Sequence, residues 1–254
     1  MNLVSNGNFE IYSQCPNNAS QITYATGWHN AALTPDYFNA CSPTSVGTNV
    51  PNAGFGYQPD CCGGGGYAGI YVLYISTANN DGREYMYTKL IDTLKSGHKY
   101  LASMYVSNTS FFNYAIATVG MLFTDTAIAL VSPQSFINAN PQVKNNTLLA
   151  DTVNWMLIQD TITAIGNEIY LTLGNFNTSV TCDSVKIFST GVDAAYYYID
   201  GVSVYDVATI GIEQNKNNAE VNVYPNPAQN NFTIEVSNNQ KQSISIFDVN
   251  GKQV

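Results

Sequence analysis

Short runs in which hydrophobic and polar residues alternate are the main pattern along this chain. The clearest is 168–173 (EIYLTL), where Ile169, Leu171 and Leu173 fall on one face. A period of two is typical of an antiparallel strand with one buried face. Further strand-like runs, separated by Gly- and Asn-rich turns, cover 68–76, 84–90, 100–106, 115–122, 154–162 and 196–205. The pattern predicts an all-β fold, an antiparallel β-sandwich of the jelly-roll type with a small β segment at the C-terminus.

The same pattern divides the chain. Residues 1–207 carry the strand signals of the sandwich, although 15–66 reads as one long irregular stretch. Residues 208–219 are polar, lack a core pattern and predict a linker. A second set of strand signals occupies 220–254, which is too short to bury a large core. Because a turn signal lies just before its end, we expect the natural protein to continue by at least one strand.

The composition and charge of the chain exclude some classes of binding partner. The 18 tyrosines and 11 phenylalanines favour strands. The net charge is −9, and the nine Lys and Arg residues form no cluster. Nucleic acids and anionic membranes both require a positive patch, so neither is expected as a partner. We expect no membrane span, since no run of about 20 apolar residues occurs. The first residues do not form a signal peptide, and we expect a leader to have been removed.

Five cysteines occur, and none has the paired C-x-x-C spacing of a zinc site. Cys15 and Cys41 lie in loop-like stretches rich in Pro, Asn and Ser. A disulfide between them is expected, worth about 3 kcal/mol. Cys182 could pair with Cys61 or with Cys62, because adjacent cysteines rarely bond each other; one thiol is then left over. Disulfides indicate an oxidising compartment, whereas free buried thiols would not.

The C-terminal strand signals carry a resemblance to a known family. They are 221–227 (VNVYPNP), 231–234 (NFTI) and 244–252 (ISIFDVNGK). The motif Y-P-N-P-x-x-x-x-F, followed by a strand ending in F-D-x-x-G, resembles the type A C-terminal sorting domain of Bacteroidota type IX secretion. The resemblance implies a secreted or cell-surface protein that the type IX secretion machinery handles. The alternative is a Pro-capped edge strand and hairpin of an ordinary sandwich.

The larger region carries a second resemblance. Residues 2–10 (NLVSNGNFE) and 196–204 (YYYIDGVSV) resemble the opening and closing strands of jelly-roll carbohydrate-binding modules of the galactose-binding-like type. In such modules a structural calcium lies where the first and last strands meet. The resemblance therefore implies that Glu10 and Asp200 are calcium ligands, and oxygen donors suit this ion. The alternative is a solvated Glu10 and an Asp200 that caps a turn.

A glycan ligand would need aromatic platforms, because the C–H face of a sugar ring stacks on a π system. Trp28 lies beside Gly27 and His29, so it either packs in the core or lies at a loop mouth. Tyr37, Phe55 and Tyr57 belong to loop-like stretches and are the other candidate ligand-binding residues. We therefore expect a polysaccharide or glycan partner.

Catalytic signals are weak. The sequence contains neither a G-x-S-x-G elbow nor an H-E-x-x-H pair. A glycosidase needs two carboxylates in a cleft, and Asp36, Asp60, Asp81 and Glu84 could supply them. The sequence gives them no pairing. We expect a non-catalytic surface module for glycan binding or adhesion. The alternatives are a structural or interaction domain without a sugar ligand, and a polysaccharide-active enzyme.

Overall fold

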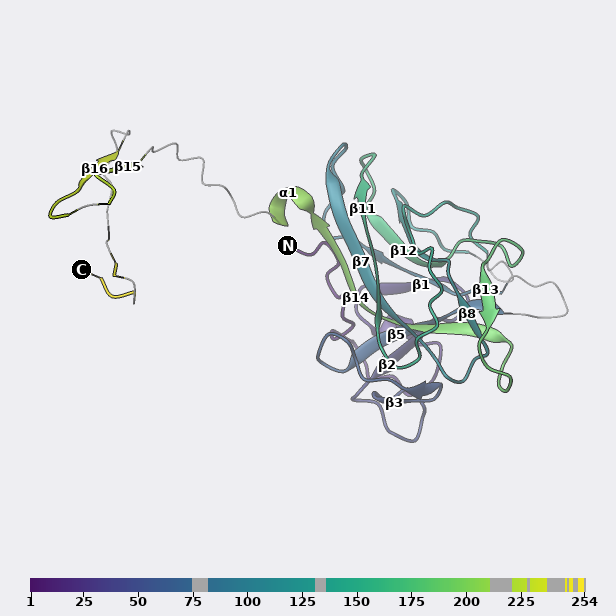
Figure 1. The fold of residues 1–254 in the computed structure, drawn as a ribbon. Coiled ribbons are helices and arrows are strands. Elements are labelled where there is room, and N and C mark those ends of the chain that lie inside the picture. Colours follow the sequence, from purple (N-terminus) through teal and green to yellow (C-terminus); the bar gives the residue numbers. More distant parts are fainter. Residues whose placement is uncertain are drawn as a thin grey trace. The chain divides into compact units, whose positions relative to one another are not determined.

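The computed structural model describes residues 1–74, 82–130, 136–210, 221–227, 229–236, 245, 247–248 and 251–253. The chain divides into two compact units, Met1–Ile210 and Gly211–Val254. The first unit is a β-sandwich (Figure 1). The expected first domain ended at Val207, and the structure adds the helical turn α1 (Val207–Ile210) to it. Nearly all of the expected linker lies outside the described residues.

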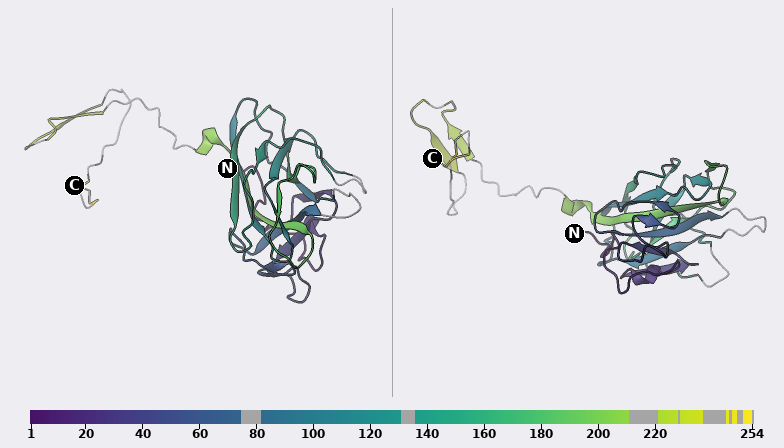
Figure 2. Two further views of the ribbon diagram at one scale, coloured as in Figure 1. Left: turned by 45° about the vertical axis from the view of Figure 1, so that its right-hand side comes forward. Right: turned by 90° about the horizontal axis from the view of Figure 1, so that it is seen from below.

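Two five-stranded sheets form the sandwich, and every pairing within them is antiparallel (Figures 1 and 2). The front sheet has the order β11 (Met156–Thr163), β7 (Lys99–Asn108), β14 (Ala194–Asp206), β5 (Gly66–Tyr74), β2 (Asp36–Asn39). The back sheet has the order β1 (Trp28–Ala32), β6 (Tyr85–Lys89), β12 (Tyr170–Asn175), β9 (Val119–Thr124), β10 (Val143–Lys144). The predicted fold class, an all-β antiparallel sandwich, is confirmed.

The core lies between the sheets and follows the alternation of the sequence. In β7, Met104 and Val106 are fully buried in the main hydrophobic cluster, while Ser103 and Tyr105, which alternate with them, are half-buried. The back sheet meets this face with side chains such as Leu171. Because successive side chains of a strand point to opposite faces, the half-buried residues of β7 lie on the outer face of the front sheet.

The stretch 15–66 is not one irregular loop, and that prediction was wrong. It holds the 3-10 turn η1 (Ile22–Tyr24), strands β1 and β2, and the short hairpin β3 (Asn52–Ala53)–β4 (Gly56–Tyr57). All four residues of β2 are buried, so this strand has no polar face to give an alternating pattern. A second small ladder pairs β8 (Tyr114–Ile116) with β13 (Ser184–Lys186).

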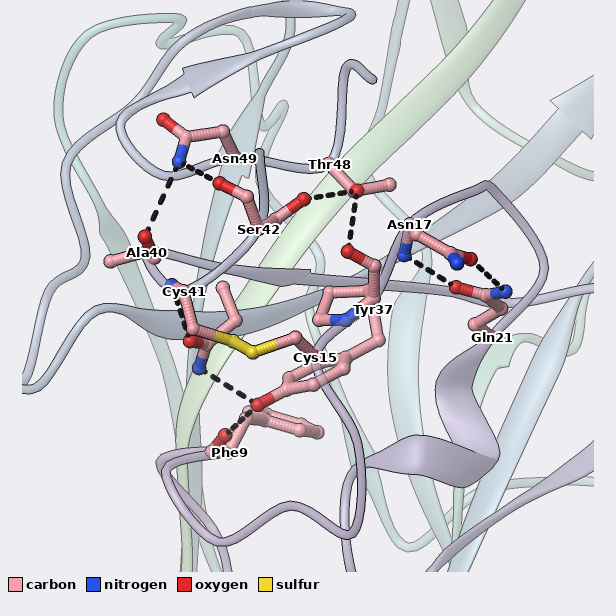
Figure 3. The surroundings of a disulfide bond; sticks show 12 residues. Phe9, Cys15, Asn17, Gln21, Tyr37, Ala40, Cys41, Ser42, Thr48 and Asn49 are labelled. Atoms are coloured by element: carbon pink, nitrogen blue, oxygen red, sulfur yellow. Dashed lines mark hydrogen bonds between the residues drawn. A yellow bond between two sulfur atoms is a disulfide. The ribbon is translucent and has the colours of Figure 1, made fainter. Parts of the chain in front are cut away.

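A disulfide joins Cys15 to Cys41, the pairing that the sequence favoured. Polar contacts surround it (Figure 3): the Asn39 side chain accepts from the Cys41 N–H, and Ser42 and Thr48 share a 2.7 Å hydroxyl contact. The bridge ties the segment before η1 to the segment after β2.

The second unit contains the hairpin β15 (Val221–Tyr224)–β16 (Thr233–Val236), with Val221 opposite Val236. The strand expected around 243–249 lies mostly outside the described residues. In the described part of the chain, no helix has the length and apolar character needed to cross a membrane.

Candidate functional site

Two of the aromatic residues expected to bind ligand are core residues, and the structure corrects that assignment. Trp28 is 1% exposed; it stacks on Phe9 with ring centroids 4.8 Å apart and donates its indole N–H to the Asn6 carbonyl at 2.8 Å. Tyr37 is fully buried and donates its hydroxyl to the Phe9 carbonyl at 2.8 Å. Neither ring can meet a ligand, because the N-terminal segment covers both.

The other two candidates lie on the β3–β4 hairpin. Phe55 is half-buried within an aromatic cluster whose other rings are Tyr71, Phe111, Phe112 and Tyr196. It therefore anchors the hairpin on the outer face of the front sheet. Tyr57 is 67% exposed and remains accessible. Phe55 places the hairpin over Tyr71 of β5 and Tyr196 of β14.

An open groove of about 630 Å³ crosses the outer face of the front sheet. Its floor is the pair Ser103 and Ser203, which face each other across β7 and β14 and are joined by a 2.8 Å hydroxyl hydrogen bond. Tyr105 and Tyr205, both half-buried, stand on either side of this pair. The register places them about 13 Å apart along the strands.

The N-terminal segment forms the other side of the groove. Leu3 donates its N–H to the Val204 carbonyl, and Val202 donates to the Gly7 carbonyl, both at 2.8 Å. The segment thus runs beside the last part of β14, where the N-terminus lies in Figure 1. The groove is lined by Met1, Asn2, Val4, Ser5, Gly7, Asn8, Ile91, Ser103, Tyr105, Gly201, Val202, Ser203 and Tyr205. None of these described side chains carries a charge.

Sequence reasoning missed this groove. The signal was available: the outward positions of 100–106 include Ser103 and Tyr105, and Ser203 and Tyr205 repeat the same order in the closing strand. If another part of the protein covered the outward face of these strands, apolar residues would be expected there. What the sequence could not show is that these two strands are neighbours.

At one end of the groove the ladder between β7 and β14 is irregular, with a shift between Asp200 and Ser203. Gly201 at this bulge has φ +57°, a left-handed conformation that glycine adopts without strain. A Cβ there would lie 2.6 Å from Cys62 Sγ and 2.9 Å from Tyr105 Cδ2. A larger residue than glycine at position 201 would therefore clash with a sulfur and an aromatic ring that pack against this backbone.

The sulfur of Cys62 belongs to a disulfide that the sequence analysis did not predict. Cys61 and Cys62 are joined to each other in a vicinal disulfide, and Cys182 is a free, buried thiol. The expected pairing of Cys182 with one of them was therefore wrong. Cys182 instead lies 3.2 Å from the Thr118 hydroxyl and accepts a contact from the Asn175 amide.

Three carboxylates gather beside the vicinal disulfide. Asp200 is 1% exposed and accepts hydrogen bonds from the backbone N–H groups of Gly201 at 2.7 Å and Cys61 at 3.2 Å. Glu10 accepts from the Gly66 N–H at 2.8 Å. Burial raises the pKa of Asp200 to about 8 against the effect of those hydrogen bonds, and the charges of Asp60 and Glu10 raise it further. Burial also raises the pKa of Glu10, and the charge of Asp60 raises it further.

The donor chemistry of this group fits a hard cation. Its charged atoms are all carboxylate oxygens, and Oδ2 of Asp60 is buried with no hydrogen-bond partner among the described residues. The three carboxylates do not converge on one point, however. The described residues bring three ligand-type side chains within 4.8 Å only at Cys61, Cys62 and Asp200, where the two sulfurs are bonded to each other. Backbone carbonyls would have to complete a calcium shell.

Two of the four carboxylates considered for catalysis, Asp36 and Glu84, serve the fold. Asp36 accepts from the Ser20 N–H at 2.6 Å and from the Tyr196 hydroxyl at 2.5 Å. Glu84 accepts from the Thr34 hydroxyl and from the Tyr71 N–H, both at 2.9 Å. Both carboxyl groups are buried and held by donors on both oxygens. Asp81 lies outside the described residues.

Solved structures resemble the chain at low identity. The CBM22-1 xylan-binding domain from Paenibacillus barcinonensis Xyn10C matches at 13% identity and a TM-score of 0.42, over 79% of this chain and 92% of that one. The K1 cleaved adhesin domain of Lys-gingipain from Porphyromonas gingivalis W83 matches at 10% identity and 0.38, over 78% and 95%. TmCBM61, in complex with β-1,4-galactotriose, matches at 12% identity and 0.36, over 81% and 99%.

Other matched structures are much larger. This chain spans 28% of the CBM22-1–GH10 modules of Clostridium thermocellum xylanase 10B and 21% of the bacteriophage CBA120 tailspike protein 4 domain. At these identities and TM-scores, the likenesses carry no argument about a ligand. No curated protein matches the chain.

The C-terminal segment gives a sharper match. Residues 222–254 match the family described as the secretion system C-terminal sorting domain. They include the Tyr224-Pro225-Asn226-Pro227 motif and the hairpin strand β16. Such a tail implies handling by the secretion machinery. The match marks this chain as a secreted or cell-surface protein with a C-terminal sorting domain.

Proposed function

We propose that the first unit is a non-catalytic, glycan-binding module that takes an uncharged polysaccharide into the groove over β7 and β14. The observation that carries the proposal is the makeup of that groove. Two tyrosine rings, Tyr105 and Tyr205, flank a hydroxyl floor of Ser103 and Ser203, and no lining side chain is charged.

Sugar rings present an apolar C–H face and a hydroxyl rim. Aromatic rings bury the face, and hydroxyl or amide groups hydrogen-bond the rim. The groove offers both kinds of group: Tyr105 and Tyr205 for the faces, and Ser103, Ser203 and Asn2 for the rim. The separation of the tyrosines along the strands favours a ligand longer than a disaccharide.

The charge of the lining residues determines which class of polysaccharide the groove favours. An acidic polysaccharide would require Lys or Arg, but the groove supplies neither and the chain carries a net charge of −9. A cationic ligand would gain from carboxylates, which are also absent from the described lining. The groove therefore favours a neutral polymer.

The test is binding of the full chain to neutral and acidic polysaccharides, measured by isothermal titration calorimetry. Tyr105→Ala and Tyr205→Ala are expected to weaken binding of a neutral polymer about tenfold each, since an aromatic contact contributes up to about 1.5 kcal/mol. Tyr57→Ala removes an exposed tyrosine outside the groove and is the matched control.

A loss confined to Tyr57→Ala would move the site to the β3–β4 hairpin. Binding to none of the polymers would contradict the proposal and favour a structural or interaction domain of a surface protein. Hydrolysis or cleavage of a bound polymer would contradict the non-catalytic part.

We also propose that a structural calcium is held beside the groove by Glu10 and Asp200, with Asp60 as a third carboxylate. The support is the buried oxygen of Asp60, which has no hydrogen-bond partner among the described residues, and the mutual repulsion of the three groups. A ligand that binds only the folded state raises the melting temperature. Calcium is expected to raise it relative to a chelator, and Glu10→Gln to reduce that shift. Asp125→Asn changes an exposed acid elsewhere and should leave it unaltered. Equal melting temperatures with calcium and chelator would contradict this proposal.

A further inference from the structure

The vicinal disulfide lies at the Tyr105 end of the groove. Its sulfur Cys62 Sγ and the Tyr105 ring both pack against Gly201, on the outer face of the front sheet. Tyr105 and Gly201 line the groove. Cys62 is exposed, and Cys61 is fixed from below through its N–H bond to the buried Asp200. The exposed Cys62 thus lies next to two residues that line the groove, Tyr105 and Gly201.

The vicinal disulfide adds little to the stability of the fold, so stability does not explain its presence. A disulfide stabilises a fold mainly by lowering the conformational entropy of the unfolded chain. This effect grows with the number of residues in the loop that the bond closes. Cys15 and Cys41 are 26 residues apart, whereas Cys61 and Cys62 are adjacent. The vicinal bond therefore constrains little of the unfolded chain. Its effect is local: it fixes the backbone just before the glycine run 63–66 and holds two sulfurs in one place.

We propose that the vicinal disulfide Cys61–Cys62 and Tyr105 together form a subsite for one sugar ring at the end of the groove. The inference rests on the proposed glycan-binding function. The ligand at this subsite is a pyranose ring that presents a C–H face to the sulfurs and to the tyrosine.

The chemistry of sulfur suits this contact. Divalent sulfur is apolar and polarisable and packs well against carbon. Two adjacent bonded cysteines have no free side-chain rotamers left to lose, so the ordering cost of binding is small. Reduction would release two separate thiol side chains beside the glycine run and end that preorganisation.

The test uses the full chain with Cys15→Ser and Cys41→Ser, which retains only the vicinal disulfide. A phosphine reductant and one water molecule convert this bond to two thiols; water supplies both protons and the oxygen of the phosphine oxide that forms. With calcium held constant, the dissociation constant for a neutral polysaccharide that binds the wild type is measured before reduction, after it, and after reoxidation. We expect binding to weaken about tenfold on reduction, the size of an aromatic-type contact, and to recover on reoxidation.

The matched control is Cys61→Ser with Cys62→Ser, which retains only Cys15–Cys41. Its affinity is expected to be about tenfold weaker than the wild type and insensitive to the reductant. Melting curves of each variant, taken in the same buffers, show whether the sandwich is intact at the temperature of the titration.

The outcomes separate the two proposals. Unchanged affinity in the reduced protein, with a loss in Tyr105→Ala, overturns the subsite and leaves the glycan-binding groove in place. Binding to no polysaccharide overturns the proposed function and the subsite with it. Equal weakening of both variants by the reductant also overturns the subsite, because the effect then does not require the vicinal disulfide.

Discussion

The hydroxyl of Tyr196 donates a 2.5 Å hydrogen bond to Oδ2 of Asp36, across the strand that separates them in the front sheet. Tyr196 lies on β14 and Asp36 on β2, and β5 runs between these strands. The tyrosine passes over Gly69 of β5, the residue in register with Asp36. A Cβ on Gly69 would lie 2.1 Å from the tyrosine oxygen. Glycine at this position is therefore what allows the contact.

This contact predicts the effect of a single methyl group. Gly69→Ala is expected to lower the free energy of unfolding by about 1–3 kcal/mol, because it overpacks the site and displaces a buried hydrogen bond. Denaturant unfolding measures the change. Gly82→Ala is the control: a Cβ there meets nothing within 4 Å, and a change within about 0.5 kcal/mol is expected. Equal effects of the two variants would show that Tyr196 does not pass over Gly69.

Stability should fall as the pH rises, because the fold buries acids. Burial raises the pKa of Glu84 to about 8, helped by the charge of Asp36 and opposed by hydrogen bonds from Tyr71 and Thr34. The folded state then holds a proton that the unfolded state has already released. This contribution is complete below the ordinary glutamate pKa of about 4.5 and is lost as the pH rises to about 8. Each such group gives a slope of up to about 1.4 kcal/mol per pH unit.

The measurement is the free energy of unfolding from pH 5 to pH 9, in chelator. Glu84→Gln is expected to reduce the slope, since its amide does not titrate. Asp200 titrates in the same range and keeps part of the slope in that variant. Stability that rises across this range would contradict a buried, protonated Glu84.

The strands of the sandwich could be predicted from the sequence where one face is polar. Ile169, Leu171 and Leu173 gave the alternation of a half-buried strand. The structure pairs Leu171 and Leu173 of β12 with β6 and β9, but it buries this strand on both faces from Leu171 to Asn175. β2 could not be predicted in this way. Asp36 and Asn39 are buried with Tyr37 and Phe38, so its four residues show no alternation at all.

The candidate site was less predictable, because it depends on contacts between distant residues. Glu10 and Asp200 were singled out together, and the structure does place both beside Asp60. The place of Trp28 stayed open because a tryptophan near a glycine looks the same in sequence whether it faces water or Phe9. The vicinal disulfide was set aside on general grounds, because adjacent cysteines rarely bond each other, and the structure joins Cys61 to Cys62.

Removing the long-range disulfide should cost stability. Cys15→Ser with Cys41→Ser is expected to lower the free energy of unfolding by about 3 kcal/mol, from the loop of 26 residues that the bridge closes. Thermal or denaturant unfolding under oxidising conditions measures this. The Cys61–Cys62 bond joins adjacent residues and closes no loop, so Cys61→Ser with Cys62→Ser should change stability far less. A larger loss from the vicinal pair would contradict the argument from loop length.

Calcium and protons should compete for Asp200. In the absence of metal its pKa is raised to about 8, chiefly by burial. A carboxylic acid must lose its proton before it binds a cation, so calcium affinity depends on pH. We expect the affinity to increase by up to about tenfold per pH unit between pH 6 and pH 8 and to level off above that range. Calorimetry in two buffers of different ionisation enthalpy should show proton release on binding at pH 6.5. Asp125→Asn should behave as the wild type, and an affinity that is the same at pH 6 and pH 8 would rule out Asp200 as a ligand.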